Sequence, residues 1–204
     1  MSRISSEKRI VSFIQGHGRG WVFTPSSLAA LDDSGSIRMA LTRLTRQGTI
    51  RRIARGLYDY PALDPKLGIL SPRADDIARA LAGRDAVRIQ PAGANAANIL
   101  GLTEQVPVRI VYLTDGRSRE VRVGRMQVVL KKTTPRQMAT AGRISGTVIQ
   151  ALRWLGQRNV DDKTIARLRR RLSETERKQL LKDLRYAPTW VAKTMRRLSQ
   201  PESA

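Results

Sequence analysis

One stretch of this 204-residue chain, residues 36–61, restricts the possible folds more than any other: it reads SIRMALTRLTRQGTIRRIARGLYDYP. Its first half has apolar residues at the i, i+3, i+4, i+7 spacing of an amphipathic helix with one buried face. These residues are Ile37, Ala40, Leu41 and Leu44. After Gly48, the β-rich runs TIRRI and LYDY flank the turn ARG. The stretch therefore predicts a helix followed by a short β-hairpin.

The residues before this stretch predict two further helices. A first helix is expected over about residues 4–16, where IVSFIQG places its apolar residues on one face before Gly16. The glycine-rich GHGRG follows, and WVF is a candidate short strand. Thr24 and Pro25 then occupy the N-cap and first-turn positions of a second helix, PSSLAALDDSG. Together with the stretch above, this order of elements predicts a winged helix-turn-helix domain over residues 1–62.

In a winged helix-turn-helix, the third helix enters the major groove of DNA and the hairpin lies along the neighbouring backbone. The helical step of 100° gives the third helix a basic outward face, and further arginines lie where a wing would contact phosphates. The predicted DNA-binding residues are Arg38, Met39, Thr42, Arg43, Arg46, Arg51, Arg52 and Arg55. A helical hairpin with a solvated basic face is the alternative. A phosphate-binding loop is disfavoured, because neither Gly48 nor Gly56 has the spacing of such a motif.

The charge of the chain also favours an anionic partner. Its 38 Lys and Arg residues against 17 Asp and Glu residues give a net charge of +21. Such a chain binds polyanions at least non-specifically, because each neutralised phosphate releases condensed counterions. The 30 arginines suit bidentate contacts to phosphate and guanine, although a GC-rich genome would also raise arginine usage. We therefore expect nucleic acid to be the leading partner.

The sequence contains no stretch of the roughly 18 apolar residues that a membrane span needs. The N-terminal residues MSRISSEKRIVSFIQG also lack the apolar core of a signal peptide. The absence of cysteine excludes disulfides, thiolate nucleophiles and cysteine-ligated metals. We expect a cytoplasmic protein that does not bind a membrane.

A second domain is expected over residues 63–204, because the proline-bearing PALDPKLGILSP breaks the pattern near residues 62–70. Its first part combines helical and strand-like segments. The expected helices are PRADDIARALAG and GANAANILG, and the expected strands are AVRIQ, VPVRIVYL, REVRV and MQVVLKK. From about residue 140 to 199 the pattern is helical. The expected fold class is α+β: a winged helix-turn-helix domain, then a small α/β domain with a basic helical C-terminal region.

This C-terminal region is the most basic part of the chain, since residues 135–204 hold 16 cations and 6 acids. A cluster without matching acids is self-repulsive unless an anionic partner binds. We predict that the cluster binds nucleic acid or an acidic protein, and a merely solvated face is the alternative. The predicted partner-binding residues are Arg167, Arg169, Arg170, Arg171, Arg177 and Lys178.

The residues that could support catalysis are few. The single histidine, His17, lies in a glycine-rich loop, and no Ser or Thr is paired with a plausible histidine base. The acid pairs at residues 32–33, 75–76 and 161–162 lie near predicted helix ends, where helix capping explains them better than metal binding. We expect a protein that is not an enzyme and has no catalytic residues, metal site or cofactor.

Two segments resemble a known family. The pattern L-x-R-L-x-x-x-G-x-I-R-R-I-x-R-G-x-Y, from Leu41 to Tyr58, and P-x-G-x-x-A-x-x-x-L-G-L, from Pro91 to Leu102, are similar to the AbiE-type antitoxins of bacterial type IV toxin–antitoxin systems. The resemblance covers about residues 5–135. It implies a winged domain that binds double-stranded operator DNA and represses the antitoxin–toxin operon. It also implies a following domain that counters a nucleotidyltransferase-like toxin, with or without direct contact.

Two other functions are left open by the sequence. One is a winged-helix transcriptional regulator whose second domain senses a ligand and has no toxin partner. The other is an enzyme that modifies or cleaves DNA and uses the winged domain for targeting. A following gene for a nucleotidyltransferase-like protein would favour the antitoxin.

Overall fold

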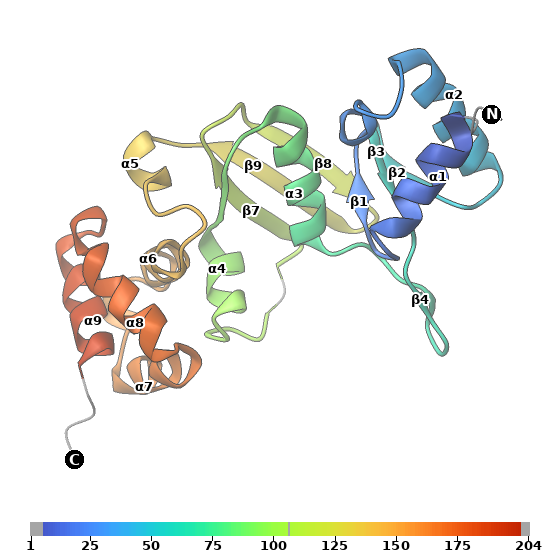
Figure 1. Ribbon diagram of the computed structural model, residues 1–204. Coiled ribbons are helices and arrows are strands. Elements are labelled where there is room, and N and C mark those ends of the chain that lie inside the picture. Colours follow the sequence, from blue (N-terminus) through green and yellow to red (C-terminus); the bar gives the residue numbers. More distant parts are fainter. Residues whose placement is uncertain (1–5, 106, 201–204) are drawn as a thin grey trace. The chain divides into compact units, whose positions relative to one another are not determined.

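The computed structural model describes residues 6–105 and 107–200 and has a mixed α+β fold (Figure 1). The chain forms two compact units. The first comprises Met1–Val87 and Val121–Met126, and the second comprises Arg88–Glu120 and Gln127–Ala204. The expected boundary at residue 62 does not coincide with this division. The helix α3, Ala74–Asp85, belongs to the first unit because it packs against the strand β1, Val22–Phe23, and the short helix η1, Pro25–Leu28.

The first unit has the first and third helices and the hairpin that the sequence indicates. In addition to β1 and η1, its elements up to residue 60 are α1, Ser6–Gly16; α2, Ser34–Arg46; β2, Arg51–Ala54; and β3, Leu57–Asp59. The four apolar residues predicted to face inward from α2 are all buried. They pack with side chains from α1, β1 and η1 in one core, whose buried members are Ile10, Ile14, Phe23, Leu28, Ile37, Ala40, Leu41, Leu44 and Ile50.

The start of α2 differs from the expectation. The predicted second helix, PSSLAALDDSG, is reduced to the 3₁₀ helix η1, and α2 already begins at Ser34. The reason is Asp33, whose Oδ1 accepts hydrogen bonds from the backbone nitrogens of Gly35 at 2.8 Å and Ser36 at 3.1 Å. The Ser36 hydroxyl, followed by these backbone donors, lowers the pKa of Asp33 to about 2. Asp33 is therefore the N-cap of α2.

The strands of the first unit form an antiparallel sheet in the order β1-β3-β2. Ala54 pairs with Leu57 across the turn Arg55–Gly56, where Gly56 has a φ of +70°. A second hairpin, which the sequence analysis treated only as a connection, follows. It consists of β4, Leu63–Asp64, and β5, Gly68–Ile69.

The second unit contains most of a four-stranded mixed sheet in the order β6-β7-β9-β8, whereas Val121–Met126, which include the end of β8, belong to the first unit. Strand β6 is antiparallel to β7, whereas β7 and β9 are parallel. Strands β7 and β9 can run in the same direction because β8, at the edge of the sheet, lies between them in the sequence. All four strands lie in segments that the sequence predicts as strands. Their bounds are β6, Ile89–Pro91; β7, Arg109–Thr114; β8, Arg119–Val123; and β9, Met126–Lys132.

Helices make up the rest of this unit. Their bounds are α4, Gly93–Ile99; α5, Pro135–Met138; α6, Ile144–Leu155; η2, Gln157–Asn159; α7, Asp162–Arg171; α8, Glu174–Lys182; η3, Leu184–Tyr186; and α9, Thr189–Ser199. The apolar faces of α4, α6, α7, α8 and α9 share one core. The helical pattern expected from residue 140 onward is confirmed. Among the described residues, no helix is both long and apolar enough to cross a lipid bilayer.

Candidate nucleic-acid interface

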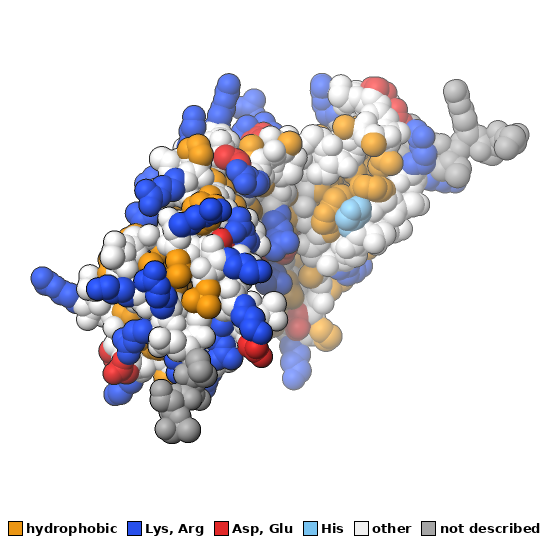
Figure 2. Space-filling model, turned by 60° about the vertical axis from the view of Figure 1, so that its left-hand side comes forward, with side chains coloured by type: hydrophobic (Ala, Val, Ile, Leu, Met, Phe, Trp, Pro, Cys, Tyr) orange, Lys and Arg blue, Asp and Glu red, His pale blue; other side chains and the backbone are white. Residues whose placement is uncertain are grey.

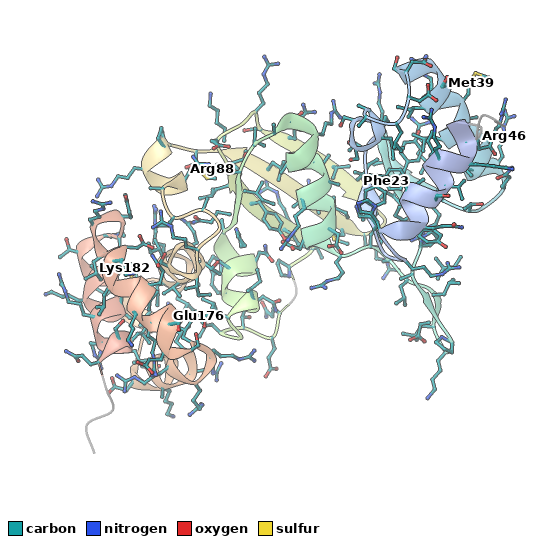
Figure 3. The ribbon with its side chains drawn as sticks, in the orientation of Figure 1. Phe23, Met39, Arg46, Arg88, Glu176 and Lys182 are labelled. Carbon is teal, nitrogen blue, oxygen red and sulfur yellow. The ribbon has the colours of Figure 1, made fainter. Side chains whose placement is uncertain are left out.

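The outward face of α2 carries the five residues predicted to contact DNA from a helix, and all five are exposed. Figure 3 shows Met39 and Arg46 projecting from α2 away from the buried Phe23. Met39 is 58% exposed although it is apolar, so this face offers a methyl-bearing side chain between arginines. The exposed residues are Arg38, Met39, Thr42, Arg43 and Arg46.

The polar side chains of this face differ in their partners. Arg43 Nη1 lies 3.1 Å from Glu7 Oε2 of α1, in an ion pair whose arginine side chain is still 57% exposed. The Thr42 hydroxyl donates to the Arg38 carbonyl at 2.9 Å. Within the described part of the chain, no acidic group lies at ion-pair distance from Arg38 or Arg46. These two guanidinium groups are therefore available to an external anion.

Arg51, one of the predicted DNA-binding residues, makes hydrogen bonds within the first unit. Its Nε donates to Asp59 Oδ1 at 2.9 Å, and its Nη2 donates to Asp59 Oδ2 and to the Leu70 carbonyl. The Asp59 side chain is only 2% exposed, so the hydrogen bonds from Arg51 offset the cost of burying its oxygens. Arg51 is thus a cross-strand partner inside the hairpin, since Arg51 and Asp59 are paired in register.

Arg52 and Arg55 also belong to the β2–β3 hairpin. Both are exposed, and Arg55 lies in the turn between β2 and β3. The pairing of the strands is irregular between Arg52 and Ala54, as in a β-bulge. The candidate interface therefore consists of the exposed face of α2 together with Arg52 and Arg55.

His17 takes part in a stack of aromatic rings. Its ring stacks on Trp21 at 3.9 Å between centroids and lies 4.6 Å from Phe13, whose carbonyl accepts a hydrogen bond from its Nδ1 at 2.9 Å. Trp21 continues the stack to Phe23 at 4.5 Å. Figure 2 shows the only histidine of the chain among hydrophobic side chains. These contacts hold the glycine-rich loop against the core of the first unit.

The acid pairs have the capping positions that the sequence predicts. Asp33 caps α2 and Asp161 caps α7 by accepting from the Thr164 backbone, while residues 75 and 76 lie in the first turn of α3. The hydrogen bond from the Thr164 hydroxyl is the main reason why the pKa of Asp161 is lowered. Over the described residues, no group of three His, Asp or Glu side chains is placed to hold a metal ion.

The six basic residues predicted as one cluster in the C-terminal region separate into three environments. Arg169 Nη2 donates to the Arg197 carbonyl at the end of α9, at 2.5 Å. Arg177 and Lys178 lie on α8, where Lys178 pairs with Glu174 at 2.6 Å. The other three, Arg167, Arg170 and Arg171, line a hollow of about 570 Å³ between α7 and the end of α4. Sequence proximity did not reveal this separation, because it depends on which face of α7 each residue occupies.

A buried polar network is a further feature that the sequence analysis missed. Asp183, whose side chain is 2% exposed, accepts hydrogen bonds from Arg143, Ser145 and Gln179. These three donors come from the start of α6 and from α8, so the carboxylate joins the two helices. The donors satisfy the carboxylate, which is typical of a structural ion pair.

Fold and surface together define a two-unit α+β protein with an exposed basic helix face and a separate arginine-lined hollow. The chain belongs to the Family of unknown function (DUF6088), whose model matches residues 9–180. The comparison with curated proteins gave no significant match. Among solved structures, the crystal structure of the RV2827C protein from Mycobacterium tuberculosis is similar, with a TM-score of 0.48 and 19% identity. That similarity covers 98% of this chain and 78% of the other.

Proposed function

We propose that the first unit is a winged helix-turn-helix module that binds double-stranded DNA through α2 and the β2–β3 hairpin. The proposal rests on the division of α2 into two faces. One face is buried in the core, and the other exposes three arginines, a threonine and a methionine. The order α1, η1, α2 and hairpin supports the proposal, since it is the order of elements in such modules.

The chemistry of this face suits base recognition. A guanidinium group can donate two parallel hydrogen bonds to the O6 and N7 atoms of guanine, and an apolar side chain can contact the thymine methyl group. Arg46 and Met39 are the candidates for these two contacts. Arg52 and Arg55 lie outside the helix, so we assign them contacts to phosphates, which position the protein without reading sequence.

A binding measurement tests this proposal. The full chain is titrated into a labelled duplex from the region upstream of its own gene, and the double variant Arg43→Ala, Arg46→Ala is compared with it. We expect a loss of about 1 to 3 kcal/mol for each arginine that makes a bidentate base contact. The matched control is Arg153→Ala, Arg196→Ala, which removes the same charge from exposed positions of the second unit. Equal affinities of both variants would refute the role of α2.

We further propose that the protein is an antitoxin that represses its own operon in the cytoplasm and counters a nucleotidyltransferase-like toxin. The support is the resemblance to AbiE-type antitoxins, which rests on one motif in each unit. The motif from Leu41 to Tyr58 spans the end of α2 and the hairpin, and the motif from Pro91 to Leu102 spans α4 and its C-terminal turn. The hollow beside α4 favours a second candidate, a winged-helix regulator that responds to a ligand.

Growth rescue separates these candidates. The full chain is produced together with the toxin-like protein encoded by the neighbouring gene. We expect both the parent chain and Arg43→Ala, Arg46→Ala to restore growth, because neutralisation belongs to the second unit and only repression needs α2. Rescue that is lost in this variant while the fold is retained would contradict the division of roles. Absence of rescue by the parent chain would favour the ligand-responsive regulator.

A further inference from the structure

The hollow of the second unit brings together three arginines from one face of α7. Arg167, Arg170 and Arg171 are spaced i, i+3 and i+4, so their side chains project from the same side of the helix. They face the C-terminal turn of α4 and the residues after it. The rest of the lining consists of Asn98, Gly101, Thr103 and Glu104.

Gly101 sets how closely the arginines approach α4. Its φ is +67°, and a Cβ atom built there would lie 2.7 Å from Arg171 Nη2 and 2.9 Å from Arg171 Cζ. Arg167 Nη1 lies 3.5 Å from the Gly101 carbonyl. Asn98 Nδ2 donates to the carbonyls of Thr103 and Gln105, each at 3.3 Å, and so shapes the far wall. The absence of a side chain at residue 101 thus allows Arg171 to lie against the backbone beside Arg167.

The charge of the hollow is unbalanced. Three guanidinium groups line it against one carboxylate, that of Glu104. In the described part of the chain, no ion pair joins any of these arginines to an acid. Helix polarity explains why arginines are tolerated in the last turn of α7, where cations are favourable. It does not explain why three converge on one hollow, since Arg169 in the same turn points instead to α9.

We propose that this hollow binds a chain of phosphate groups, such as the triphosphate of a nucleotide. Guanidinium groups form bidentate, charge-assisted hydrogen bonds with phosphate oxygens, and three of them at one place match several negative charges on neighbouring phosphates. The volume of about 570 Å³ lies in the range of small-molecule sites. A nucleic-acid backbone would be matched better by cations spread along a surface than by cations gathered in one hollow.

The lining also indicates which part of a nucleotide the site would recognise. None of the described residues around the hollow is aromatic, so the hollow offers no aromatic ring on which a base could stack. Recognition therefore rests on the phosphates, and the identity of the base has little influence. This inference does not depend on DNA binding by α2, because the two sets of residues belong to different compact units.

The test is calorimetric titration of the full chain with inorganic tripolyphosphate, ATP and UTP, without divalent metals, at about 0.15 M salt to screen weak surface attraction. The variant is Arg167→Gln, Arg170→Gln. The matched control is Arg153→Gln, Arg196→Gln, which removes the same charge from exposed positions outside the hollow. Thermal unfolding of each variant verifies its fold, and the single variant Arg170→Gln replaces the double one if that protein does not fold.

We expect all three ligands to bind, with ATP and UTP within about threefold of each other, because the lining has no aromatic side chain and the phosphates make the charge-assisted contacts. The hollow variant should bind tripolyphosphate about tenfold more weakly or worse, since charge-assisted hydrogen bonds are removed, while the control changes by less than about twofold. No binding by the parent chain, or equal losses in the two variants, would overturn the proposal. The Arg43→Ala, Arg46→Ala variant should bind tripolyphosphate normally, so failure of this site is distinguishable from failure of the DNA interface.

Discussion

At the scale of single residues, the acid beside an arginine decides whether that arginine is available to a partner. Arg51 is held by buried Asp59, Arg43 shares an exposed ion pair with Glu7, and Arg46 has no acidic partner in the described part of the chain. Sequence reasoning treated the three alike. It could not separate them, because Asp59 lies across a hairpin and Glu7 lies on another helix, 36 residues away.

The Glu7–Arg43 pair leads to a prediction about DNA affinity. Glu7 places a negative charge beside the face that we propose to contact DNA, so Glu7→Gln should strengthen binding by about twofold to fivefold at low salt. Stability should change little, because an exposed ion pair contributes about 0 to 1 kcal/mol. Fluorescence anisotropy with the upstream duplex measures the first effect and urea unfolding the second. Weaker binding by the variant would instead mean that Glu7 orients Arg43 for its contact.

At the scale of elements, local signals explain most of what the sequence predicted. The apolar spacing of α2 was sufficient to identify its buried face. Ser173 and Glu176 likewise form a capping box at the start of α8, which is the S-x-x-E sequence signature of a helix N-terminus. The second predicted helix was wrong because Asp33 bonds to Gly35 and Ser36 and starts α2 early. For the β4–β5 hairpin a signal was present, since Pro65 lies in the turn and Gly68 directly follows it, but it was interpreted as a linker.

The hollow beside α4 could not be predicted from the sequence. Its two sides, Gly101 and Arg167, are 66 residues apart in the chain. The motif ending in Leu102 identified Gly101 as a residue of interest, and the arginine run identified α7. Only the packing of α4, α6 and α7 in one core brings the two segments together.

The position of α3 leads to a prediction about fragments. Ile77 and Ala78 of α3 are fully buried, and the helix packs against β1 and η1. A fragment of residues 1–62 lacks this helix and leaves part of the β1 and η1 surface uncovered. We therefore expect residues 1–87 to unfold at a clearly higher temperature than residues 1–62 when both are followed by circular dichroism. Equal unfolding temperatures would show that α3 contributes nothing to the first unit.

At the scale of the whole molecule, the net charge is +21, and arginines that contribute to it lie on two different surfaces. One is the exposed face of α2 with the hairpin arginines, and the other is the arginine-lined hollow of the second unit. Figure 2 shows that Lys and Arg side chains outnumber acidic ones on the face that carries the C-terminal helices. Any positive charge attracts DNA over a distance of about one Debye length. Affinity alone therefore cannot identify the surface that recognises the DNA sequence.

The measurement that tests the central claim most directly is therefore the ratio of affinities for the upstream duplex and for an unrelated duplex. It compares the parent chain with three double alanine variants that each remove two arginines. The helix variant changes Arg43 and Arg46, the wing variant changes Arg52 and Arg55, and the control changes Arg153 and Arg196. Each ratio is measured over a series of salt concentrations.

The account predicts that the helix variant loses most of the ratio, because base contacts carry the sequence information. The wing variant should keep the ratio while binding both duplexes more weakly, and its salt slope should fall by about 0.9 for each phosphate that is no longer neutralised. The control should retain the ratio of the parent chain. An unchanged ratio in the helix variant, or equal ratios in all three variants, would contradict the claim that α2 reads DNA.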